Sequence, residues 1–278
     1  MKFRHLAVAV ATLVAAGCSR ETVNENAFSW SDTIPAGATL HLRDGTGSIT
    51  VHASGSHTAL VRGAVHSRRG RLKDVSFVVN RNGGDYFICA MWRNSGRCDA
   101  SGYRGSSHRP WWTIFSLFRH GSDAAANLMV DLPPGTQLDA RTTNGVVTID
   151  GATAGVTARA VNGGVHVSDV SGPLMLTTTN GDVRLSSASL APNDSVHLST
   201  VNGAVRAELP PNIDGQFDIS VVNGVVRSDL AIPGASMSRR RVAGQVGASD
   251  RVVRVHTVNG AVILTSHPTA ASTAVPLR

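Results

Sequence analysis

One short sequence pattern recurs through the second half of the chain and constrains its fold more than any other feature. The pattern is an Asn-Gly pair between two runs of alternating apolar and polar residues, first clear in 138–150 (LDARTTNGVVTID). The Asn residues of the six copies are Asn144, Asn162, Asn180, Asn202, Asn223 and Asn259. Their spacing follows a period of about 18 to 22 residues with one doubled interval, which is typical of a solenoid.

Alternation with a period of two predicts two half-buried strands in each copy, because the apolar spacing of three and four that a helix requires is missing. The Asn-Gly pair between these strands is also the signal for a hairpin turn, which would give an antiparallel sandwich. However, the side-chain classes match from one copy to the next, as they do when like positions stack as parallel strands. The sequence therefore favours an all-β, single-domain parallel β-helix (β-solenoid) with an Asn ladder at one corner, where Gly supplies the backbone conformation.

An earlier copy at 40–51, with Thr46-Gly47 in the Asn-Gly place, indicates that the solenoid covers 35–266. Strands are also expected at 58–66, 72–80 and 85–92, and the Asn82-Gly83-Gly84 turn predicts some antiparallel pairing in this N-terminal part. We expect a loop at 236–249 and a disordered tail at 267–278, which is rich in Ala, Ser, Thr and Pro.

The first residues predict export and lipidation. Positive charge followed by a short apolar run makes 1–17 a signal peptide, and Cys18 after Ala-Gly resembles the lipobox of bacterial lipoproteins, in which the Cys is acylated. The usual Leu of that motif is Ala15 here, and an ordinary signal peptide cut near Ala16 is the alternative. Residues 18–34 are then the lipidated Cys and a polar tether, and Ser19, by the same resemblance, favours the outer membrane.

Cys89 and Cys98 remain as an even pair in an oxidising compartment, so we expect a disulfide that closes a loop. They border a segment, 93–126, that breaks the repeat and is rich in Arg and aromatic residues. Its apolar stretch contains Trp111, Trp112, Phe115 and Phe118. Two interpretations stay open: these side chains cap an end of the solenoid, or they contact a membrane interface or an acidic partner.

The chain is basic, with a formal net charge of +7. Arg184, Arg206 and Arg227 each lie four residues after an Asn of the pattern, which predicts an outward row with a spacing of about 4.8 Å. This row is either a solvated face or an anion-binding site. Acidic glycans, lipopolysaccharide or another envelope protein are the partners that fit, and nucleic acid is not expected outside the cytoplasm.

Parallel β-helices include polysaccharide lyases and hydrolases, whose chemistry needs carboxylates that converge on one face. Here the acids are scattered. Glu208 and Asp229, on coils expected to be neighbours, form the nearest pair, and the sequence shows no phosphate loop, nucleophile motif or metal-ligand spacing. We therefore expect a non-enzymatic protein without metal or cofactor. A carbohydrate-active β-helix enzyme is the alternative.

The lipobox, the early DGTGSITV, the LPPG and the TTNGVVTIDG repeats together resemble a bacterial domain family of unknown function described as a "putative adhesin". The resemblance covers 35–266 and is weak in 93–126. It implies a β-solenoid fold and an envelope location. Because that family has no established activity, it implies no functional residues.

Overall fold

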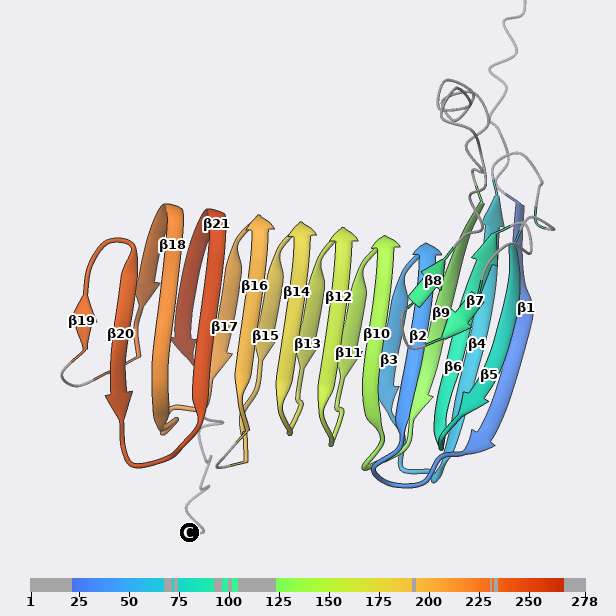
Figure 1. Ribbon diagram of the computed structural model, residues 1–278, viewed down its shortest axis with the longest axis horizontal. Coiled ribbons are helices and arrows are strands. Elements are labelled where there is room, and N and C mark those ends of the chain that lie inside the picture. Colours follow the sequence, from blue (N-terminus) through green and yellow to red (C-terminus); the bar gives the residue numbers. More distant parts are fainter. Residues whose placement is uncertain are drawn as a thin grey trace, which may run out of the picture.

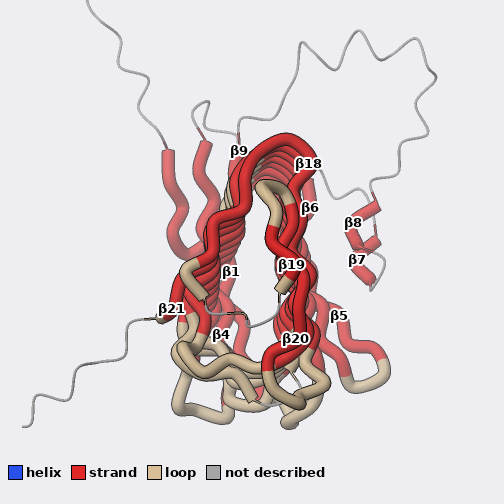
Figure 2. Tube along the Cα trace, turned by 90° about the vertical axis from the view of Figure 1, so that its left-hand side faces the viewer, coloured by secondary structure: helices blue, strands red, loops and turns tan. Residues whose placement is uncertain are grey.

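The computed structural model describes residues 22–67, 72, 75–92, 97–99, 102–104, 124–191, 194–230, 232 and 235–267, and the elements within them are β-strands. No helix in this part of the chain is long and apolar enough to cross a membrane. The strands stack into an elongated solenoid (Figure 1). Seen along its axis, the solenoid is a flattened arch, with strands running over one corner and loops at the opposite edge (Figure 2).

Each central coil contributes one strand to each of two facing layers, which we call the first and the second sheet. The first sheet contains β2 (Thr39–Thr46), β10 (Gln137–Asn144), β12 (Val156–Asn162), β14 (Leu174–Asn180) and β16 (Val196–Asn202). The second contains β3 (Ile49–Ala53), β11 (Val147–Asp150), β13 (Val165–Ser168), β15 (Val183–Ser186) and β17 (Val205–Leu209). Between the two strands of a coil, the chain turns at the Asn-Gly corner.

Like positions of successive coils lie side by side in parallel register. On the first sheet Leu138 pairs with Val156 and Val156 with Leu174, and on the second Val147 pairs with Val165. These inward side chains are buried, whereas the alternate positions face outward. The alternation of the sequence thus becomes a continuous apolar core between the sheets. The predicted parallel β-solenoid is confirmed.

The corner is built from close backbone contact between coils. Gly163 has a φ of +147°, and a Cβ there would lie 1.8 Å from the carbonyl oxygen of Gly145, so only glycine fits. Just before the corner, a column of inward threonines donates hydroxyl hydrogen bonds to glycine carbonyl oxygens of the adjacent coil. These bonds are Thr142 to Gly47, Thr178 to Gly163, Thr200 to Gly181 and Thr257 to Gly203, at 2.7–3.0 Å.

Antiparallel strands close the N-terminal end of the solenoid. These are β1 (Thr22–Thr33), β4 (Thr58–Ser67), β5 (Val75–Asn82), β6 (Asp85–Trp92) and β9 (Ala124–Leu132). β5 and β6 form the predicted hairpin, β4 pairs antiparallel with β1 and β9, and β6 and β9 pair in parallel with β2 and β3. Stacked Phe28 and Phe77, with ring centroids 4.8 Å apart, pack against the interior from this end, and Trp30 lies against Tyr86.

Two predicted boundaries in this region are wrong. Residues 22–33, expected as part of the tether, form β1, because Phe28 and Trp30 pack against the core and β4 satisfies the backbone groups. The insertion expected at 93–126 ends earlier, since β9 begins at Ala124. Within it, β7 (Arg97–Asp99) and β8 (Gly102–Arg104) form a small hairpin.

At the C-terminal end, the order of coils differs from the order of the sequence. The last strand, β21 (Val252–Ser266), inserts between the coil of β16 and β17 and the strand β18 (Gly215–Ser228). The segment 236–249, expected as a loop, contains β19 (Ser236–Met237) and β20 (Arg241–Val246). β20 pairs antiparallel with β18 and covers an edge that would otherwise be open.

Candidate functional site

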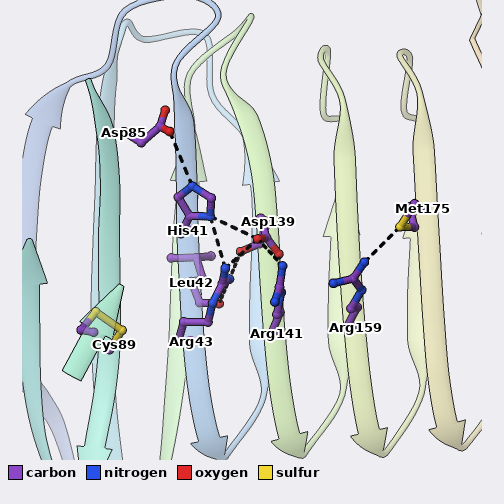
Figure 3. Close-up of polar contacts among 10 residues, drawn as sticks. His41, Leu42, Arg43, Asp85, Cys89, Asp139, Arg141, Arg159 and Met175 are labelled. Atoms are coloured by element: carbon purple, nitrogen blue, oxygen red, sulfur yellow. Dashed lines mark hydrogen bonds and ion pairs between the residues drawn. A yellow bond between two sulfur atoms is a disulfide. The ribbon is translucent and has the colours of Figure 1, made fainter. Parts of the chain in front are cut away.

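Three arginines on neighbouring strands form a column on the outward face of the first sheet. Arg43 on β2 pairs in register with Arg141 on β10, which in turn pairs with Arg159 on β12. Each lies three residues before the corner residue of its coil, so the three side chains leave the same side of the sheet. We call Arg43, Arg141 and Arg159 the arginine column (Figure 3).

One carboxylate, that of Asp139, organises the start of this column. Its Oδ1 and Oδ2 accept hydrogen bonds from Nε and Nη2 of Arg141, both at 2.8 Å, in a bidentate pair. Oδ2 also accepts from Nη2 of Arg43 at 2.6 Å and lies 3.1 Å from Nδ1 of His41. Two arginines from adjacent strands therefore share one carboxylate.

The Asp139 network is largely shielded from water. The Arg43 side chain is 3% exposed and also donates through Nη1 to the backbone oxygens of Leu42 and Asp139. Burial lowers the pKa of Arg43, and the Asp139 charge opposes this change. Burial raises the pKa of Asp139, but hydrogen bonds from His41 and Arg141 and the Arg43 charge outweigh it and hold that pKa below its usual value. The group is a fixed ion cluster at neutral pH.

His41 completes this cluster at its N-terminal edge. Its ring stacks on Phe87 with centroids 4.4 Å apart, and its Nε2 lies 3.8 Å from a carboxylate oxygen of Asp85. The stack and the Asp139 contact fix the imidazole from two sides. His41 therefore extends the ordered polar surface onto β6.

Two hollows flank the outer part of the arginine column. One, of about 550 Å³, crosses β2 to β16, and the other, of about 390 Å³, lies toward the corner. Arg141 and Arg159 line both. The first hollow also includes His41, Asp139, Thr157, Met175 and His197, and the second includes Arg43, Asp44, Thr142 and Thr177. The two arginines therefore stand in a groove on the sheet face.

Comparison with known proteins places this architecture in a family. The model of the Toastrack DUF4097 family matches residues 94–265, more than half of the 278 residues. The chain belongs to the Toastrack DUF4097 family. No curated protein matches it.

Two crystal structures resemble the Toastrack chain over most of its length. A "putative cell adhesion protein" from Clostridium sporogenes ATCC 15579 is 12% identical, with a TM-score of 0.42, and the match covers 86% of this chain and 99% of that one. A "putative adhesin" from Bacteroides fragilis NCTC 9343 is 9% identical, with a TM-score of 0.37, and the match covers 88% and 97%.

The predicted arginine row of the Toastrack chain does not form as expected. Arg184 and Arg206 are neighbours on the second sheet, but Arg227 is separated from Arg206 by Ile263, because β21 lies between β17 and β18. Asp182 also lies 2.8 Å from Arg206 and 3.5 Å from Arg184. The row is interrupted by an apolar residue, and its first two arginines share one carboxylate, that of Asp182.

The six asparagines do form a ladder, in the order of the coils. Five Asn–Asn bonds of 2.8–2.9 Å, each from Nδ2 to the Oδ1 of the next Asn, link them in the order Asn223, Asn259, Asn202, Asn180, Asn162 and Asn144. The last of these, Asn144, donates to the carbonyl oxygen of Gly45 at 3.4 Å. Asn223, and not Asn259, therefore ends the ladder. The side chains are exposed and line the outside of the corner. The ladder is a surface feature that fixes the coil register.

In the first coil, an acid takes the place of the corner threonine. Asp44 pairs in register with Thr142, and its carboxyl Oδ2 is buried without a hydrogen-bond partner among the described residues. A Cβ built on Gly47 would lie 2.9 Å from this Oδ2 and 1.7 Å from the carbonyl oxygen of Ala126, so both oxygens border Gly47. Burial raises the pKa of Asp44 to about 8, against smaller opposing effects of the Thr46 and Gly45 amides.

The acids weighed for catalysis do not converge. Glu208 pairs with Thr265 of β21 and accepts a hydrogen bond from Ser186, whereas β18, which precedes Asp229, lies on the other edge of β21. The expectation that these acids lie on neighbouring coils is wrong. In the described part of the chain, no group of three or more His, Cys, Asp or Glu side chains is placed to hold a metal ion.

Cys89 and Cys98 form a disulfide that attaches β7 to β6, with Cα atoms 5.9 Å apart. The remaining sequence-predicted sites, Cys18 and the aromatic residues Trp111, Trp112, Phe115 and Phe118, lie outside the described residues, as do the predicted signal peptide, 1–17, and most of the predicted tail. The sequence analysis did not predict the arginine column. The pattern that could have indicated it is an Arg three residues before the corner residues Thr46, Asn144 and Asn162.

Proposed function

We propose that this Toastrack chain is a non-enzymatic binding protein of the bacterial envelope, held at the outer membrane by an acylated Cys18. The solenoid is the rigid body that displays a binding face. Its partner carries negative charge, as an acidic glycan, lipopolysaccharide or an acidic envelope protein does. No cofactor is required.

The observation that carries this proposal is the ordered groove around the arginine column. Asp139 fixes Arg43 and Arg141 through four side-chain and backbone contacts, so cationic groups are held in place before any ligand arrives. Preorganised arginines favour recognition of oxyanions. The acids that glycoside cleavage would need are spread over separate strands, which favours binding over catalysis.

The anchor is supported by the sequence Ala16-Gly17-Cys18 after a short apolar run. Cells that express the wild-type protein should incorporate labelled palmitate into it and retain it in the membrane fraction. The Cys18→Ser variant should lose the label and leave that fraction. An unlabelled wild-type protein together with a membrane-bound variant would contradict the anchor.

A further inference from the structure

Arg159 differs from the two other members of the arginine column because it has no internal carboxylate. In the coil of Arg141, Asp139 lies two residues earlier and forms a bidentate ion pair with the guanidinium. In the next coil, the position in register with Asp139 is Thr157. Among the described residues, the one hydrogen bond of the Arg159 side chain goes to Sδ of Met175, at 3.1 Å, and a thioether is a weak acceptor.

Arg141 presents a second set of donors beside Arg159. Its Nε and Nη2 are bound to Asp139, and its Nη1 has no hydrogen-bond partner among the described residues. Adjacent strands are about 4.8 Å apart, so the two guanidinium groups can reach one small oxyanion. Both line the hollows of about 550 and 390 Å³ on this face, which gives such an anion space.

We propose that Arg141 and Arg159 bind a carboxylate of an acidic glycan. The ligand carboxylate lies beside Thr157, the position at which the coil of Arg159 has no acid of its own. The inference rests on the proposed binding function and specifies its site and ligand class. Asp139, held by Arg43 and Arg141, shows on the same face how two arginines from adjacent strands hold a planar carboxylate. The ligand carboxylate repeats that arrangement one strand further along.

The surroundings of the two arginines suit a sugar polymer. Thr157 and Thr177 offer hydroxyl groups, and Met175, 40% exposed, offers an apolar surface to a sugar ring. Further along the same face, His197 on β16 pairs in register with Arg254 on β21. A chain of uronic acids laid across the strands would meet a further cation, Arg254, beyond Arg159.

The test measures binding of polygalacturonate to the full-length protein in detergent by calorimetry, with fully methyl-esterified polygalacturonate and polyphosphate as comparison ligands. The wild-type protein should bind polygalacturonate, more weakly as salt rises, and should not bind the ester. Arg159→Gln should weaken binding about tenfold, the loss expected for one hydrogen bond to a charged group. Arg227→Gln, on the other sheet and outside both hollows, should leave binding unchanged.

A second pair of variants tests the site without removing an arginine. Thr157→Asp supplies Arg159 with the internal carboxylate that Asp139 gives to Arg141, so it should block binding about as strongly as Arg159→Gln. Thr157→Asn, of similar size but uncharged, should retain binding. Both variants should keep the wild-type melting temperature, because the side chain is only half-buried.

A wild-type protein that does not bind polygalacturonate, or that binds polyphosphate in preference, would overturn the ligand class. Unchanged binding in both Arg159→Gln and Thr157→Asp would overturn the site. Neither result affects the membrane anchor, which the palmitate label tests separately. Loss of binding in Thr157→Asp but not in Thr157→Asn would establish that the missing carboxylate creates the site.

Discussion

The two outward faces of the solenoid carry the same kinds of charged side chain but hold them differently. On the first sheet, Asp139 binds Arg43 and Arg141 within a shielded cluster in which the Arg43 side chain is 3% exposed. On the second sheet, Asp182 bridges Arg184 and Arg206, whose side chains are 56% and 46% exposed. Each carboxylate binds two arginines on adjacent strands, but only the first cluster contains an arginine, Arg43, that is buried away from water.

This difference determines what each face can do. Water screens the second face, so its ion pairs contribute little to stability and hold the side chains loosely. On the first face, burial holds the charged side chains in place, because separating Asp139 from Arg43 would leave a buried cation without water or a partner. A rigid cationic surface thus depends on whether the ion pairs that hold its arginines are buried, and not on the number of arginines in a column.

Replacing the two carboxylates should give the largest contrast between the faces. Asp139→Ala leaves Arg43 buried without a counter-ion and should lower the free energy of unfolding by about 3 to 5 kcal/mol. Asp182→Ala should lower it by about 0 to 1 kcal/mol. Urea denaturation at pH 7 measures both, and equal losses would mean that burial does not distinguish the faces.

The contribution of Asp139 to the free energy of unfolding should also depend on pH. Its pKa in the folded protein is held below the ordinary 3.8, so the carboxylate stabilises the fold above pH 3.8. That stabilisation is lost as the pH falls from 3.8 toward the folded value. Comparison with Asp139→Ala at each pH isolates it from other titrating groups.

Asp44 sharpens the comparison, because it is a buried carboxyl group without an arginine. Its pKa is raised to about 8 in the folded protein, so the folded state holds a proton that the unfolded state releases above pH 3.8. Stability should therefore fall as the pH rises from about 4 to about 8. Asp44→Thr copies the hydroxyl of the other coils, should remove this slope and should add about 1 to 3 kcal/mol at pH 8.

Asp44→Asn serves as the matched control, since it stays neutral at every pH and keeps the size of the side chain. Both variants should have the same shallow dependence on pH when unfolding is followed from pH 5 to pH 9. If Asp44→Asn kept the wild-type slope, the slope would belong to other groups, and the proposed protonation of Asp44 would be wrong.

Much of this fold could be predicted from the sequence because its signals are local. The alternation of apolar residues and the Asn-Gly corners predicted the strands of the repeats and their parallel stacking. The place of β21 could not be predicted, since β18 and β21 carry equivalent Asn-Gly corners and nothing local orders Asn223 after Asn259. That error also displaced Arg227 from the predicted row.

The site was harder to predict because it joins distant parts of the chain. Arg43 and Arg141 meet only because β2 stacks on β10, after the chain between them has formed the N-terminal end. In the sequence, Asp139 is one of several scattered outward acids. Asp139 can hold two arginines because His41 and Arg43 bury its carboxylate. Strand periodicity does not indicate this burial. The prediction of a tether at 22–33 was wrong for a similar reason. Phe28 packs on Phe77, which lies far along the chain, and this contact is not visible in the local sequence.

The smallest expected effect lies at the corner between the two faces, where the Asn ladder is open to water. Asn180 donates to Asn162 and accepts from Asn202, so Asn180→Ala removes two exposed hydrogen bonds and should cost about 1 kcal/mol. Asn223 ends the ladder with one bond, to Asn259, and its replacement by Ala should cost about half as much. Thermal unfolding of both variants beside Asn259→Ala provides the measurement. Because Asn259 lies inside the ladder, its variant should resemble Asn180→Ala, and an Asn259→Ala protein as stable as Asn223→Ala would contradict the insertion of β21 between β16 and β18.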